Sequence, residues 1–163
     1  MLQKEILVEL QEYIALHLNR GETDYCLEAP HPIYEEEIFS SELEDFIKMN
    51  RKPTLQQVLF HYIDQKGVTD SAIYKKAGLD RRHFSKIRSN PDYHPKKHTA
   101  IALAFALELD IDDTEDLLSA GGYSLSDSDT SDLIVRFFLN NEIFDLQVLN
   151  ETLDHFQLKT LNV

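Results

Sequence analysis

The side chains best suited to binding chemistry are cations that gather in one stretch of the chain. Residues 75–97 hold eight Lys or Arg against two Asp, a net charge of +6, while the whole 163-residue chain carries −13. Ammonium and guanidinium groups bind phosphate oxygens, and the planar fork of Arg can also bond the O6 and N7 atoms of a guanine together. This stretch therefore predicts a surface for a polyanion within a chain that is otherwise acidic.

Two short helices joined by a tight turn are predicted to position these cations. Thr69 and Asp80 are good N-cap residues, and Gly78 lies between them where the chain must reverse. In the second helix Phe84 and Ile87 point one way, so the basic side chains point elsewhere. The spacing predicts a helix-turn-helix over residues 69–88, an arrangement that commonly reads DNA.

The rest of the chain favours helices and contains no convincing strand, so the predicted fold class is all-α. Residues 2–19 have an apolar stripe at helical spacing, and residues 97–109 are apolar on nearly every side, which predicts a central helix. Residues 21–37 contain two prolines and three consecutive glutamates, which favours a loop. Capping signals predict further helices that begin at Ser41 with Glu44, at Thr54 with Gln57, and at Asp112 or Asp113.

Charge divides the chain into three predicted regions. Residues 1–53 (5 Lys/Arg, 12 Asp/Glu) form an acidic helical region with a loop, residues 54–123 (9 and 10) form the helix-turn-helix bundle, and residues 124–163 (2 and 7) form a C-terminal helical pair. The apolar stripes expected on this pair are Leu133, Ile134, Phe137 and Phe138, and then Leu146, Leu149, Leu153 and Phe156. These stripes must be buried against each other, against the N-terminal helix or against a second subunit.

Other candidate sites carry weaker signals. His94 and His98 stand four apart, but Pro95 lies between them and no Cys or Glu accompanies them, which argues against zinc. Cys26 is the only cysteine, which excludes an intramolecular disulfide, and its acidic surroundings disfavour a reactive thiolate. There is no phosphate-binding Gly-rich loop and no nucleophile elbow. We therefore expect no enzyme, no metal and no cofactor.

The longest unbroken apolar run, residues 100–107, is far too short to cross a bilayer, and the N-terminal sequence is too charged for the core of a signal peptide. We therefore expect a cytoplasmic protein with no membrane partner.

From Thr54 to Tyr123 the chain resembles the bacterial Cro/repressor-type (XRE-like, lambda-repressor-like) DNA-binding domain of five helices. In that family the second helix and turn commonly read TQEELAKKAGVS, and here positions 69–80 read TDSAIYKKAGLD. The later stretch TAIALAFALELDIDDTEDLL is similar to the family's long apolar helix and short acidic helix. The C-terminal two thirds also resembles a helical extension of some bacterial macrodomain proteins. The macrodomain itself is absent, so no ADP-ribose chemistry is carried over.

The resemblance implies that the helix over residues 81–89 enters the major groove of duplex DNA, as in a small transcriptional regulator. Such a regulator is expected to be a homodimer, because one short helix reads too few base pairs. The implied contacts to bases and backbone come from Arg81, Arg82, His83, Ser85, Lys86 and Arg88. The implied phosphate contacts come from Lys75, Lys76, Lys96 and Lys97.

Three positions depart from the family pattern. Asp70 replaces a Gln that bonds the DNA backbone, and Asp80 replaces a small hydroxyl, so each is expected to bring a negative charge toward phosphate. Tyr74 replaces a small Ala where two helices cross, which is expected to widen their separation or turn the ring outward.

These departures leave an alternative open. The chain is then a non-enzymatic interaction adaptor whose basic face meets an acidic protein partner. The two hypotheses also combine, since the acidic segment over residues 22–45 is able to compete with phosphate for the basic face.

Overall fold

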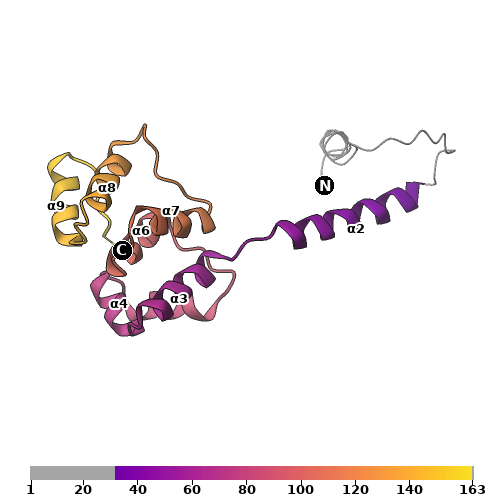
Figure 1. Cartoon of the computed structure of the whole chain (residues 1–163), viewed down its shortest axis with the longest axis horizontal. Coiled ribbons are helices and arrows are strands. Elements are labelled where there is room, and N and C mark those ends of the chain that lie inside the picture. Colours follow the sequence, from indigo (N-terminus) through magenta and orange to yellow (C-terminus); the bar gives the residue numbers. More distant parts are fainter. Residues whose placement is uncertain (1–31, 163) are drawn as a thin grey trace. The chain divides into compact units, whose positions relative to one another are not determined.

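The computed structural model describes residues 32–162, and within that range the chain is all-helical (Figure 1). The helix expected over residues 2–19 lies outside the described residues. The chain divides into two compact units, residues 1–50 and residues 51–163. Among the described helices, none is both long and apolar enough to cross a membrane.

The described part of the first unit is helix α2, Pro32–Asn50. The sequence prediction was wrong here, because it placed a loop through residue 37 and a helix start at Ser41. The helix begins at Pro32 instead, since a proline is tolerated at the first helical position, where its missing N–H has no intrahelical partner. Ser41 and Glu44 therefore lie inside the helix and do not cap it.

Three helices at the start of the second unit have the ends that the sequence predicted. They are α3, Leu55–Lys66, α4, Asp70–Lys76, and α5, Arg81–Ser89. Thr54 Oγ1 accepts a hydrogen bond from the Gln57 N–H at 3.3 Å, and Gln57 Oε1 accepts one from the Thr54 N–H at 3.0 Å. Thr69 and Asp80 cap α4 and α5 as predicted. The cap at Asp80 fixes where α5 begins.

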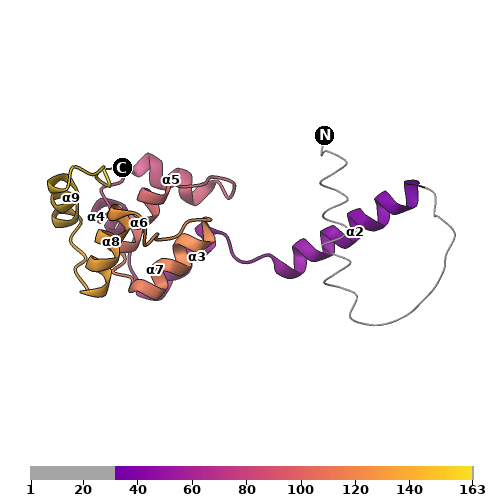
Figure 2. The same ribbon diagram turned by 90° about the horizontal axis from the view of Figure 1, so that it is seen from above.

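Helix α6, Lys97–Ala106, lies in the middle of this unit, as the sequence predicted (Figures 1 and 2). Every residue from Thr99 to Leu107 is buried, and α4, α7 and α9 all pack against this helix. Helix α7, Ile111–Ala120, is capped by Asp110, whose Oδ1 accepts from the Asp113 N–H at 2.8 Å. The predicted cap at Asp112 or Asp113 was therefore wrong, because both lie in the first turn.

The last two helices, α8, Thr130–Asn140, and α9, Leu146–His155, pack against each other and on α7 and α6 respectively. Residues 124–163 thus belong to the same compact unit as α3 to α7. The predicted stripes were partly wrong, because Leu133, Phe137 and Phe156 are exposed. Helix α8 turns Val135 and Leu139 toward the core instead.

Candidate nucleic-acid interface

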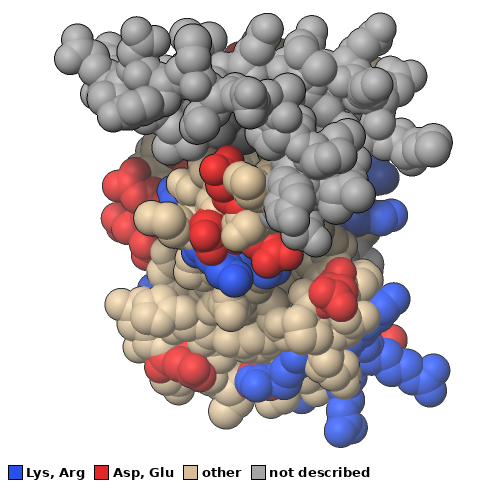
Figure 3. Space-filling view, turned by 90° about the vertical axis from the view of Figure 1, so that its right-hand side faces the viewer, with Lys and Arg blue, Asp and Glu red and all other residues tan. Residues whose placement is uncertain are grey.

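Helix α5 has one buried face and one exposed face. Phe84 and Ile87 are buried against the core, while Arg81, Arg82, Ser85 and Lys86 are exposed and His83 is half-buried. This division follows from the spacing of the two apolar residues, three apart on a helix. In the face shown in Figure 3, Lys and Arg side chains gather and project at the lower edge.

The cations of the basic stretch differ in what they contact, and the first group is ion-paired. Lys76 Nζ lies 2.6 Å from Glu108 Oε1, and this hydrogen bond lowers the pKa of Glu108. Lys97 Nζ lies 2.6 Å from Oδ2 of the buried Asp132, so it joins α6 to α8. The structure therefore gives two of the predicted phosphate contacts a carboxylate partner within the chain.

Arg88 forms a bidentate ion pair with Asp70. Its Nε donates to Asp70 Oδ2 at 2.6 Å and its NH2 group donates to Asp70 Oδ1 at 2.8 Å. The guanidinium also lies over the Phe60 ring, 4.4 Å from its centroid. The hydrogen bond to Asp70 raises the pKa of Arg88. The sequence alone suggested that Asp70 is an isolated negative charge. In the structure its charge is paired with that of Arg88.

A second pair of contacts involves Tyr93, which follows α5 and which sequence reasoning missed. Lys86 Nζ lies 4.5 Å from the centroid of the Tyr93 ring, and His83 Nε2 lies 2.9 Å from the Tyr93 hydroxyl oxygen. A lone Tyr in a polar loop carries no sequence signal for this arrangement. Tyr93 thus contacts the side of α5 that lies opposite Arg88.

The remaining predicted cations have no such constraint. Arg81, Arg82, Lys75 and Lys96 are exposed, and no carboxylate of the described residues lies within 4.0 Å of any of them. Arg81 and Arg82 stand in the first turn of α5, and Lys75 stands in the last turn of α4. These side chains are available for an external anion.

Three residues outside α5 fix its position. Gln56 Nε2 donates to the carbonyl oxygens of Ile87 at 2.9 Å and Arg88 at 2.6 Å, which ties the end of α5 to α3. The rings of Tyr74 and Phe60 lie 5.8 and 6.1 Å from the Phe84 ring. The ring of Tyr74 is thus turned inward against α5. Helix α5 is consequently anchored at its apolar face and at its C-terminal end.

Other chemistry finds little support in the part of the chain that the structure describes. No group of three His, Cys, Asp or Glu side chains is arranged to hold a metal ion there. The Tyr62 hydroxyl donates to Asp113 Oδ1 at 3.1 Å, and burial together with this bond raises the pKa of Tyr62 to about 12. Tyr62 is therefore a structural hydrogen-bond donor at neutral pH.

Comparison of the chain with protein-family models, with curated proteins and with solved structures gave no match in any of the three.

Proposed function

We propose that this chain is a small transcriptional regulator that binds duplex DNA through the exposed face of α5. The observation that supports the proposal most is that Arg81 and Arg82 on one helix are exposed and have no carboxylate partner among the described residues, in a chain with net charge −13. Surface acids would serve solubility as well, so a local excess of free Arg favours a binding role.

The dimensions of α5 suit a major groove. A helix with its side chains is about 10–12 Å across, and the major groove of B-DNA is about 12 Å wide. Arg82 and Ser85 lie on the side opposite the buried Phe84 and Ile87, so they are the side chains that would reach base edges. Cations on the flanks of the helix would meet phosphates.

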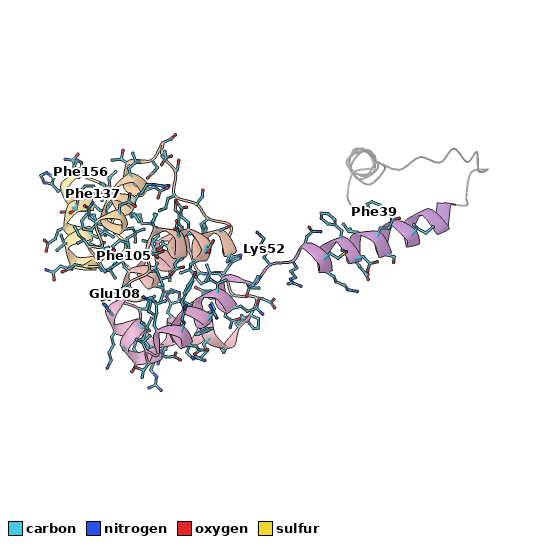
Figure 4. All side chains as sticks on the ribbon, in the orientation of Figure 1. Phe39, Lys52, Phe105, Glu108, Phe137 and Phe156 are labelled. Atoms are coloured by element: carbon cyan, nitrogen blue, oxygen red, sulfur yellow. The ribbon has the colours of Figure 1, made fainter. Side chains whose placement is uncertain are left out.

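A regulator of this kind would act as a homodimer, because nine residues contact only a few base pairs. The exposed apolar side chains of the C-terminal helices, Leu133, Phe137 and Phe156, are the proposed dimer contact. Figure 4 shows Phe137 on α8 and Phe156 directly after the end of α9, whereas Phe105 lies inside the bundle.

The test is fluorescence anisotropy of a labelled mixed-sequence duplex titrated with the full chain at 50 and 200 mM salt. We expect binding that weakens steeply with salt, and an Arg82→Ala variant that binds roughly tenfold more weakly, because it loses a base or phosphate contact. Lys159→Ala is the matched control, since it also removes one exposed cation but outside α5. Absence of binding at 50 mM salt would reject the proposal.

A second candidate function is the interaction adaptor, and the ion pairs favour it. Lys76, Arg88 and Lys97 each have a carboxylate partner, so the basic face is weaker than the sequence count of eight cations suggests. A moderately basic face suits an acidic protein surface, where partners are brought together by complementary charge. A chain that fails to bind DNA at low salt and binds acidic polypeptides such as polyglutamate would support this function.

A further inference from the structure

The two sides of α5 each carry a cation that is held against an aromatic ring. Arg88 lies over Phe60 on one side, and Lys86 lies over Tyr93 on the other. Both differ from Arg82, which has no ion-pair or aromatic partner among the described residues. A helix that occupies a major groove has one row of phosphates along each of its sides. The two ring-held cations stand where those rows would pass.

We propose that Asp70 is a positioning residue that holds Arg88 as a preordered contact to a DNA phosphate. This inference rests on the proposed function, and it assigns to Asp70 a role opposite to simple charge repulsion. Asp70 occupies Nε and NH2 of the guanidinium, and Phe60 covers one face of its plane. The NH1 group has no partner among the described residues and is left to donate to a phosphate oxygen.

This arrangement favours binding because it fixes the Arg88 side chain, and not because it adds charge. A free Arg side chain must lose much of its rotamer freedom when it binds, and a side chain that is already fixed loses less. Gln56 adds to the order, because it holds the carbonyl oxygens of Ile87 and Arg88 and so fixes the backbone from which the guanidinium extends. The negative charge of Asp70 is itself balanced by the positive charge of the guanidinium that donates both hydrogen bonds.

The arrangement also requires Arg rather than Lys. A guanidinium has separate N–H groups for a carboxylate and for a phosphate in one plane, and it stacks on a ring, whereas an ammonium is a compact point charge. Substituting Lys for Arg88 keeps the charge and loses the fixed geometry. This difference separates the effect of position from the effect of charge.

The experiment measures the duplex affinity of the full chain and of Asp70→Asn, Asp70→Glu, Arg88→Lys and Arg88→Gln at several salt concentrations. We expect Asp70→Asn and Arg88→Lys each to bind three- to tenfold more weakly than the parent chain. Arg88→Gln is expected to reduce the slope of log K against log salt by about 0.9, the loss of one phosphate contact. Asp70→Glu keeps the carboxylate and is expected to bind more tightly than Asp70→Asn.

A matched control is Glu108→Gln, which also removes one negative charge and also frees a cation, Lys76, from an ion pair of 2.6 Å. It is expected to bind as tightly as the parent chain or more tightly. In the background of Arg88→Gln, Asp70→Asn is expected no longer to weaken binding, because Asp70 acts only through Arg88. A role of Asp70 that is independent of Arg88 would weaken binding in that background as well.

The outcomes are separable from the test of function. Tighter binding by Asp70→Asn, or unchanged binding by Arg88→Lys, would overturn the inference while leaving DNA binding in place. Loss of all binding by the parent chain would overturn both. Circular dichroism and thermal unfolding test whether each variant keeps the fold of the parent chain, and the salt slope of Arg88→Gln tests the phosphate contact independently of stability.

Discussion

Two regions of the second unit use their cations in opposite ways. In α4 and α5, four of the cations are exposed and have no carboxylate partner in the part of the chain that the structure describes, and α5 carries its apolar residues on the buried side. In α8 and the segment before it, Arg136 contacts Glu115 at 3.2 Å and Asp127 at 3.5 Å, and donates to the Leu125 carbonyl at 3.2 Å. The second region also exposes the apolar side chains of Leu133 and Phe137.

The difference shows that a cation takes part in structure where neighbouring elements supply oxygen atoms to all of its nitrogen atoms, as for Arg136, and is available for binding where some of its N–H groups are left without them. Arg136 and Lys97 both join helices that are distant in the sequence. Arg81 and Arg82 join nothing within the described residues. Removing a structural cation and removing an exposed cation are therefore expected to have different effects.

The largest expected effect is on stability, at the structural cation Lys97. Lys97→Ala leaves the Asp132 carboxylate, of which 8% is exposed, with only the Ser126 N–H as a donor from elsewhere in the fold. Removing one partner of a buried ion pair costs about 3 kcal/mol of unfolding free energy. Lys76→Ala removes an exposed pair of equal length and is expected to cost less than about 1 kcal/mol. Urea unfolding of both variants tests the contrast, and equal costs would contradict it.

The next largest expected effect is on the affinity for duplex DNA, and it comes from the acidic residues 1–50. Residues 1–50 contain three Lys/Arg against twelve Asp/Glu, and like charge raises the free energy of approaching DNA. A chain over residues 51–163 is therefore expected to bind a duplex about tenfold more tightly than the full chain at 50 mM salt. The gain should shrink at 200 mM, because exposed charges are screened within about 8 Å near that ionic strength. Equal affinities at both salt concentrations would show that the acidic region has no influence on binding.

A feature of the structure could be predicted from the sequence when the residues that form it are close together along the chain. The caps at Thr54, Thr69 and Asp80 were predicted because each bonds a backbone N–H two or three residues away. The buried position of Phe84 on α5 followed from helical spacing in the same way. These are local interactions, and a linear pattern contains them.

The ion pairs were not predicted, because their partners are distant in the sequence. Arg88 and Asp70 are separated by 18 residues, and Lys97 and Asp132 by 35. Only tertiary packing brings those atoms together, so a count of charges treated all the cations as equivalent. The same reason explains why the exposed side of α8 was misplaced, since which apolar residues face inward depends on how α8 sits on α7 and α9.

A smaller effect on stability is expected at the exposed apolar face of α8. Phe137→Glu is expected to change the unfolding free energy by less than about 1 kcal/mol, because 60% of the residue is exposed and the substitution removes mainly the contact with the Phe138 ring, 6.2 Å between centroids. If this face forms the proposed dimer, the variant will be a monomer by sedimentation at concentrations where the parent chain is a dimer. Ser131→Glu adds a charge on another side of α8 and serves as the control. A dimer that persists in Phe137→Glu would place the subunit contact elsewhere.

The smallest expected effect is a pH dependence of the unfolding free energy that arises from His98. This half-buried side chain on α6 has its pKa lowered from 6.5, first by burial and then by the nearby Lys159, Lys96 and His83. The unfolded chain then takes up a proton more readily than the folded chain as the pH falls below 6.5, so stability is lost in that range. In His98→Gln this part of the loss is removed, and the difference in unfolding free energy between pH 7.5 and 5.5 becomes smaller than in the parent chain. Urea unfolding at the two pH values measures it. An unchanged difference would mean that neither burial nor the surrounding cations lower the pKa of His98 in the folded chain.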